Sequence, residues 1–213
     1  MSNSGSRGLS DLSLRELCRA LAARRPTPSG GSLAAGVGAL GAAGISMTLR
    51  YAEGEGQAWQ AGRGDELEAL SQRLCDLVER DAAIYDKVAA ARELPAGAAR
   101  AAAMEKALRE ALETPLEMME ACLGALRIAV AGSALGVPQH LACDTLAGAQ
   151  ALWVALEDAC LMVRENAGGV PLDQDSEALV AGAEAMRLEA ARLLREVRGH
   201  AEAAGLSGKG GAR

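Results

Sequence analysis

Apolar residues recur along most of the chain at intervals of three and four, the spacing that places them on one face of an α-helix. The pattern is most regular between residues 65 and 92, and it returns in 116–130 and 179–197. We find no segment in which apolar and polar residues alternate as they do in a half-buried strand. The sequence therefore predicts an all-α fold, a bundle of long helices.

Prolines, glycines and capping residues divide this pattern into segments. Ser13 and Glu16 form a capping box, Pro26 ends the first helix, and Thr114-Pro115 has the composition of a helix start. We expect a single domain over residues 1–213, with 1–8 and 207–213 as disordered tails. The expected helices cover 13–24, 32–49, 65–92, 98–113, 114–136, 138–166 and the segment from about 175 onward.

Residues 26–49 join a proline- and glycine-rich turn to an uncharged run of small and apolar residues. Glycine destabilises a helix interior by about 1 kcal/mol relative to alanine, so the repeated glycines of this run need another role. Rows of small residues such as Ala34, Gly38 and Ala42 let helix backbones approach closely. We therefore expect a central buried helix with Ser32 as its N-cap.

The turn at 27–32 has two interpretations. It is a plain capped loop, or Gly30, Gly31 and Ser32 present N–H groups and a helix N-terminus to an anionic or carbonyl group of a ligand. Its spacing matches neither a P-loop nor a dinucleotide-binding fingerprint. On the sequence alone, the plain capped loop is favoured at least as much as the binding turn.

Asp81 interrupts the apolar seam of residues 67–88. A carboxylate that points into a bundle is costly unless it is paired or hydrogen-bonded, and such groups occur at functional sites and in structural networks. We favour a functional site in which Asp81 faces the turn at 27–32. The alternative is a structural aspartate that caps another helix or pairs with an arginine, for which Arg164 is a candidate. Tyr85, one helical turn on, would share the pocket wall. Asp144 is a weaker candidate, because the first turn of a helix attracts acids electrostatically.

Composition and charge narrow the classes of partner. The net charge of −6 argues against a nucleic-acid-binding protein, which carries a basic patch. The run 33–49 is short and glycine-rich for a membrane span, so we expect a buried helix and no membrane contact. Five cysteines without a C-x-x-C pair, and only two histidines, predict no metal site. These scattered cysteines and the absence of a visible signal peptide predict a cytoplasmic protein.

The order of the motifs carries a resemblance to a known family. Residues 26–32 read Pro-Thr-Pro-Ser-Gly-Gly-Ser before an Ala/Gly-rich helix, and residues 81–88 read Asp-Ala-Ala-Ile-Tyr-Asp-Lys-Val, followed by Leu94-Pro95. Three further pieces follow in the order that the family shows: Thr114-Pro115-Leu116, the segment around Asp144, and the sequence from Val163 to Asn166. Over residues 14–193 the chain resembles the formiminotetrahydrofolate cyclodeaminase / methenyltetrahydrofolate cyclohydrolase family.

The resemblance implies an all-helical fold, a homodimer packed through helices, and a tetrahydrofolate derivative as the substrate, with no metal or other cofactor. The cyclodeaminase closes the formimino group of its substrate onto N10 and expels ammonia, which gives 5,10-methenyltetrahydrofolate. The cyclohydrolase adds water to the methenyl carbon, which gives 10-formyltetrahydrofolate. The sequence leaves both reactions open, because one acid/base pair serves either.

The resemblance also implies roles for particular residues. A carboxylate in a helix seam is the kind of group that exchanges protons during catalysis. Asp81 and Asp144 would carry the acid/base chemistry, Gly30, Gly31 and Ser32 would hold polar atoms of the substrate, and Tyr85, Arg164 and Asn166 would line the cleft.

The chain departs from the family pattern at four places. Ser29 replaces the first of three turn glycines, and Met162 stands where an asparagine is common. Residues 51–56 replace a lysine-rich stretch, and the segment around Asp144 reads Cys-Asp-Thr-Leu-Ala where Ser-Asp-Ala-Gly-Val is more usual. Without the positive charges of the lysine-rich stretch, we expect weaker binding of an anionic, polyglutamylated folate. These departures leave an alternative open: a catalytically inactive helical homodimer that uses the same cleft to bind another ligand.

Overall fold

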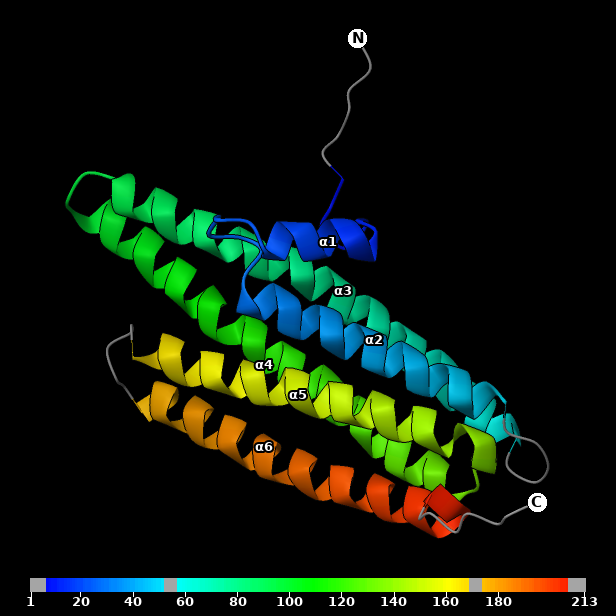
Figure 1. Ribbon diagram of the computed structural model, residues 1–213. Helices are drawn as coiled ribbons and strands as arrows, with labels where there is room; N and C mark the ends of the chain where they lie inside the picture. The colour runs from blue at the N-terminus through cyan, green and yellow to red at the C-terminus, as the bar shows by residue number, and fades with distance from the viewer. Residues whose placement is uncertain (1–6, 52–56, 169–173, 207–213) are drawn as a thin grey trace.

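The computed structural model describes residues 7–51, 57–168 and 174–206, and every element in these ranges is a helix, which confirms the predicted all-α fold (Figure 1). These ranges contain six α-helices and two single-turn helices, of which η1 precedes α5 and η2 follows α6. In chain order they are α1 Leu14–Leu21, α2 Gly30–Arg50, α3 Gln57–Glu93, α4 Ala98–Ala134, η1 Gln139–Leu141, α5 Ala142–Ala167, α6 Gln174–Ala201 and η2 Glu202–Leu206.

The second helix is the central element of the bundle. It packs along α3 on one side and α5 on the other, while α6 covers α4 and α5. A Cβ atom on Gly41 would lie 2.8 Å from the carbonyl oxygen of Gly148, and one on Gly148 would lie 2.6 Å from Cγ1 of Ile45. The small residues therefore permit the close approach of α2 and α5, as the sequence predicts.

The start of α2 differs from the prediction. The helix begins at Gly30, and its N-cap is Ser29, which makes no side-chain capping hydrogen bond. The prediction that Ser32 is the N-cap is wrong, because Ser32 lies in the first turn and is 1% exposed. Its hydroxyl is directed at α3 instead.

The third helix begins at Gln57, eight residues before the predicted start at Asp65. Residues 57–64 are poor in large aliphatic side chains, so their periodicity gave no helical signal. Tertiary contacts hold this extra segment: Ser46 donates a hydrogen bond of 2.7 Å to the carbonyl of Gly64.

A single helix, α4, replaces the two helices predicted at 98–113 and 114–136. Pro115 lies inside it and lacks the N–H that would bond to the carbonyl of Ala111. Asn166 of α5 supplies the missing donor, with its Nδ2 atom 2.6 Å from that carbonyl oxygen. Thr114 does not cap a helix start, since its hydroxyl donates to the carbonyl of Glu110 at 2.9 Å. The helix therefore continues through the proline.

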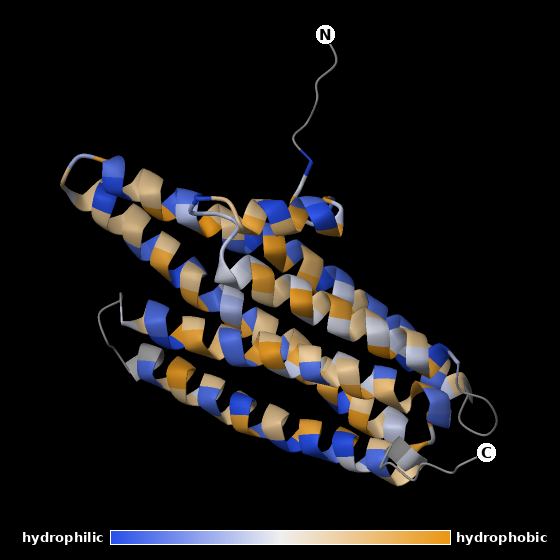
Figure 2. Cartoon of the chain, in the orientation of Figure 1, coloured by the Kyte–Doolittle hydropathy of each residue, from blue (hydrophilic) through white to orange (hydrophobic). Residues whose placement is uncertain are grey.

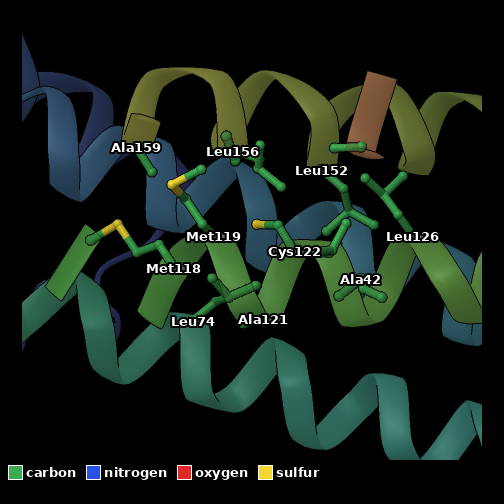
Figure 3. Close-up of a cluster of buried hydrophobic side chains, with 14 of the residues drawn as sticks. Ala42, Leu74, Met118, Met119, Ala121, Cys122, Leu126, Leu152, Leu156 and Ala159 are labelled. Carbon is green, nitrogen blue, oxygen red and sulfur yellow. The ribbon is translucent and has the colours of Figure 1, made fainter. Parts of the chain in front are cut away.

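Aliphatic, methionine and cysteine side chains fill the core in a chain that contains no phenylalanine. Figure 2 shows α2 and α5 as mostly hydrophobic or neutral, whereas hydrophilic residues alternate along the visible side of α6. The close-up in Figure 3 shows side chains of the facing helices that meet in this core, among them Met118, Met119, Cys122, Leu152 and Leu156.

Among the residues that the structure describes, two segments are long and apolar enough to cross a membrane by length and composition alone. They are Gly30–Arg50 and Gln139–Ala167. In the most apolar 18-residue stretch of each, 61% and 44% of the residues, respectively, are buried. Both pack against other helices of the bundle. Core helices of this kind satisfy the same test of length and composition.

The first helix is shorter than predicted and ends at Leu21, although its capping box between Ser13 and Glu16 is confirmed. None of its residues is buried. Before it, Ser10 donates hydrogen bonds to Oε1 of Glu79 from its backbone N–H at 2.7 Å and from its hydroxyl at 3.1 Å.

Most of the two predicted tails lies outside the described residues. The predicted connection at 53–56 and the predicted helix end at 169–171 also lie outside them. Arg7 and Gly8 are described. The N–H of Asp11 donates to the carbonyl of Gly8 at 3.2 Å, and the guanidinium of Arg7 is bonded to the carbonyl of Asp11.

Candidate functional site

Asp81 of α3 lies beside the first turn of α2, as predicted. The hydroxyl of Ser32 donates to Oδ2 of Asp81 at 2.8 Å, and the hydroxyl of Ser29 approaches the same oxygen at 3.3 Å. Ser32 also lies 3.3 Å from the carbonyl oxygen of Val78. Asp81 is half-buried. The turn residues that the sequence singles out therefore hold one oxygen of this carboxylate.

The other oxygen of Asp81 lies over Gly31. A Cβ atom on Gly31 would overlap Oδ1 of Asp81 and lie 2.5 Å from Cε of Met162. Only a glycine leaves room for the carboxylate to approach the backbone here. No hydrogen bond to Oδ1 is found within the part of the chain that the structure describes. This oxygen is therefore available to a bound molecule.

The start of α2 adds backbone donors to the same place. The first intrahelical bond of α2 runs from the N–H of Leu33 to the carbonyl of Ser29, which leaves the N–H groups of Gly30, Gly31 and Ser32 without helical acceptors. Such N–H groups and the helix dipole favour a carbonyl oxygen or an anion. A proton acceptor and a set of donors thus lie side by side.

Two more predicted residues lie at this end of α2. Gly30 is open, since a Cβ atom there would meet nothing within 4 Å. Tyr85 lies one helical turn beyond Asp81 and is 51% exposed. The position of Tyr85 agrees with a role in the wall of the site, although its ring is at the surface.

Asp144 lies at the opposite end of the α2–α5 pair. Its neighbour Thr145 places its hydroxyl 3.1 Å from that of Thr48, near the C-terminal end of α2. Gly31 and Thr48 are about 25 Å apart along the helix at 1.5 Å per residue. The structure therefore does not bring Asp81 and Asp144 together within one chain.

Arg164 and Asn166 lie near the C-terminal end of α5, but other partners engage their side chains. Arg164 is bonded to Glu184 of α6, so the predicted structural pairing with Asp81 is wrong. The Arg164 and Arg187 guanidinium groups hold the pKa of the Glu184 carboxyl below its usual value, with the hydrogen bond from Arg187 as the largest cause. Asn166 is bonded to the carbonyl of Ala111.

Charged pairs join α3 to α4 beyond the site. Arg80 donates to Glu117 at 2.5 Å, and Lys87 is bonded to Glu110. The hydrogen bond from Lys87 lowers the pKa of the Glu110 carboxyl, and the charges of Lys87, Lys106 and Arg80 add to this effect. These pairs hold the two helices that carry Asp81 and Pro115 together.

An apolar groove of about 310 Å³ lies between α1 and α2 and reaches the site. Five leucines of α1 and α2 are among its lining residues, and Ser32 and Val78 lie in its wall. Ser32 therefore contacts both the groove and Asp81. This arrangement could hold the apolar part of a small molecule while polar atoms of the same molecule meet Asp81.

Two residues outside the predicted site set contribute to it. The hydroxyl of Ser29, a departure from the family's glycine, lies against Asp81. The methyl group of Met162, a departure from asparagine, packs beside Gly31. These contacts depend on how α2, α3 and α5 meet, which the sequence around each residue does not reveal. Within the described ranges, no three His, Cys, Asp or Glu side chains gather as a metal ion would require.

Comparison with known proteins adds sequence and fold relationships. A model of the formiminotransferase-cyclodeaminase family matches residues 13–187. The methenyltetrahydrofolate cyclohydrolase of Methylorubrum extorquens is 31% identical over 162 residues, which cover 70% of this chain and 76% of that protein. The formimidoyltransferase-cyclodeaminase of Mus musculus is 35% identical over 122 residues, or 53% of this chain, which spans only 23% of that longer protein.

A solved structure shares the fold. The crystal structure of formiminotetrahydrofolate cyclodeaminase from Thermotoga maritima superimposes with a TM-score of 0.82 at 22% sequence identity. The match covers 90% of this chain and 96% of the Thermotoga maritima chain. The helical architecture is therefore common to both proteins.

Proposed function

The chain belongs to the formiminotransferase-cyclodeaminase family, and from this premise we propose that it is an enzyme that acts on a C–N bond of a folate. The substrate is 5,10-methenyltetrahydrofolate or 5-formiminotetrahydrofolate. The first reaction to test is the cyclohydrolase reaction, because the relative with that name is matched over 76% of its length. Cyclodeamination is the second candidate, supported by the 35% identity to the mouse protein.

In both reactions the reacting carbon becomes tetrahedral between two nitrogens. A group close to this carbon must take up a proton. In the cyclohydrolase reaction, water adds to the cationic methenyl carbon and releases one proton. The C–N5 bond then breaks as the second water proton passes from the carbinol oxygen to N5. In cyclodeamination, N10 attacks the carbon of the protonated formimino group, and the proton that N10 loses goes to the nitrogen that departs as ammonia, which leaves the cationic methenyl product.

One observation carries the proposal: the arrangement of the Asp81 carboxylate. Hydroxyl donors hold its Oδ2 atom, and Oδ1 lies over Gly31 with no partner among the described residues. A carboxylate positioned in this way can accept a proton from water or from N10 without reorganising. The N–H groups of Gly30 and Gly31 would bind a polar atom of the same substrate.

The apolar groove beside Ser32 supports a folate as the ligand. Binding pockets for small molecules are mostly apolar, with a few polar groups that fix the orientation. The leucines of α1 and α2 would pack against the aromatic part of the substrate, and Asp81 would meet its reacting carbon.

Replacing Asp81 with asparagine tests the role of the carboxylate. Asp81→Asn keeps the shape of the side chain and removes the proton acceptor, so turnover should fall on the order of 10²–10⁴-fold. The control is Asp86→Asn, the same change at an exposed position of the same helix, which should leave turnover unchanged. The assay follows the loss of absorbance of 5,10-methenyltetrahydrofolate, and circular dichroism checks the helix content.

The outcomes separate the candidates. Full activity of Asp81→Asn would refute its catalytic role. Gain of methenyltetrahydrofolate absorbance and release of ammonia from 5-formiminotetrahydrofolate would identify the cyclodeaminase. A wild-type protein that neither turns over nor binds a folate would refute the proposed function and leave the inactive binding protein.

A further inference from the structure

The first helix lies over the apolar groove without packing into it. Leu14, Leu17, Cys18 and Leu21 recur at intervals of three and four and line the groove from the α1 side. In Figure 1, α1 lies at the edge of the bundle beside α2 and α3. No residue of α1 is buried, and Leu14 is 69% exposed. In a closely packed pair, helix axes lie about 8–10 Å apart and such side chains interdigitate. The apolar face of α1 therefore points at α2 without being buried against it.

The opposite wall of the groove has the same character. Leu33 and Leu40 of α2 line it, and they are 46% and 67% exposed. Water between two apolar walls is unfavourable, so the walls gain by closing around an apolar molecule that displaces it. The volume of about 310 Å³ lies within the range of pockets that bind small molecules. A flat apolar ligand in the groove would contact both walls once α1 moved inward.

Helix α1 is attached to the bundle through the segments at its two ends. Before it, Ser10 donates two hydrogen bonds to Oε1 of Glu79, and a Cβ atom on Gly8 would lie 2.7 Å from the same oxygen. After it, residues 22–29 lead into α2. Among the described residues, no hydrogen bond joins residues 11–28 to another helix. The capping box keeps the turns of α1 together, so α1 can move as a unit between its two attachments.

Both attachments of α1 lie next to Asp81. Glu79 precedes Asp81 by two residues on α3. Ser29, at the end of the other attachment, lies 3.3 Å from Oδ2 of Asp81. Ser32, which is bonded to the same oxygen, is part of the groove wall. An inward movement of α1 therefore closes the space beside the carboxylate, and not a remote surface.

We propose that α1 is a lid that closes over a folate whose aromatic part fills the groove, and that Glu79 is the residue that positions this lid. The inference rests on the proposed function, because it takes a folate as the ligand. The structure shows the open position, in which the groove is accessible between α1 and α2. On closure, the leucines of α1 contact the bound ring and separate the reacting carbon from bulk water. Arg15 and Arg19 do not line the groove and stay in the solvent.

Tryptic cleavage within α1 measures closure without turnover. Trypsin cuts after Arg15 or Arg19 when α1 opens locally, so the cleavage rate reports how often α1 detaches. Since neither arginine lines the groove, a bound molecule slows this cleavage by holding α1 and not by covering the sites. At a concentration ten times its Kd, 5-formyltetrahydrofolate should slow cleavage by about 10-fold if it binds only with α1 in place. Cleavage after Arg100, exposed in the first turn of α4, is the control and should not change.

Calorimetric titration with 5-formyltetrahydrofolate separates this inference from the proposed function. Binding without slower cleavage in α1, or with equal slowing after Arg100, overturns the lid and leaves the proposed function in place. Slower cleavage confined to α1, in a protein that turns over neither folate substrate, supports the lid and identifies the inactive binding protein. A protein that binds no folate overturns both.

Variants of Glu79 test its positioning role. Glu79→Ala removes the acceptor of both bonds from Ser10, so the KM for the folate substrate and the Kd for 5-formyltetrahydrofolate should rise by about 10-fold. The kcat should change by less than about 3-fold, because Asp81 keeps its own contacts. Glu79→Gln keeps an oxygen acceptor and should restore both constants. Glu93→Ala, the same change at an exposed glutamate at the end of α3, should alter none of them. A lower kcat with unchanged KM and Kd would show that Glu79 acts on Asp81 instead, and would overturn its role in the lid.

Discussion

The bond between Asn166 and the carbonyl of Ala111 predicts a measurable coupling with Pro115. Ala111 is 7% exposed, and Pro115 leaves its carbonyl without a helical donor. Asn166→Ala removes the donor that replaces it. Pro115→Ala restores an N–H at the position where an α-helix would bond to that carbonyl. The two substitutions should therefore not be additive.

The size of the coupling follows from the carbonyl group. A buried acceptor left without a partner costs about 1–3 kcal/mol, so Asn166→Ala should lower the free energy of unfolding by about that amount. In the Pro115→Ala background, the N–H of residue 115 would satisfy the same carbonyl. Asn166→Ala should then cost less by about 1–2 kcal/mol, well above the roughly 0.5 kcal/mol scatter of independent sites. Pro115→Ala alone also changes packing, so only the coupling is interpreted.

Urea unfolding of four proteins, followed by circular dichroism, measures this coupling: the wild type, each single variant and the double variant. All four are compared at one protein concentration, because any association between chains would make the apparent stability depend on concentration. Additive changes in the free energy of unfolding would show that Asn166 does not compensate for Pro115. The continuity of α4 would then need another explanation.

Two further predictions concern single positions. Gly31→Ala should lower turnover on the order of 10²-fold, because its Cβ atom would displace the Asp81 carboxylate, whereas Gly30→Ala, which meets nothing within 4 Å, should not. Equal turnover of the two variants in the methenyltetrahydrofolate assay would contradict the proposed placement of Asp81. Burial raises the pKa of the Cys122 thiol to about 12, so near neutral pH it should react with a thiol reagent only after unfolding. Wild type and Cys122→Ala should therefore show the same number of fast-reacting thiols, and a missing fast thiol in Cys122→Ala would refute the expected protection.

Local patterns were sufficient to predict the helical class and the approximate position of the central helix. The three-and-four spacing of apolar residues reports which face of a helix is buried, whatever lies opposite. The small residues of α2 likewise indicated close packing before their partner, α5, was known. The sequence indicated Asp81 as a site candidate because a carboxylate in an apolar seam is costly wherever the seam packs. Its hydrogen bond with Ser32 confirmed that it faces the turn at 27–32.

The tertiary structure decided the features that depend on a distant partner. Thr114-Pro115 has the local signature of a helix start, but Asn166, far along the chain, supplies the bond that lets α4 continue. Ser32 has the signature of an N-cap, but Asp81 takes its hydroxyl, and the helix starts at Gly30. Asp144 matches the expected motif, yet the antiparallel packing of α2 and α5 puts it at the far end from Asp81. A side chain's partner is set by how helices meet, and the sequence near that residue carries no record of it.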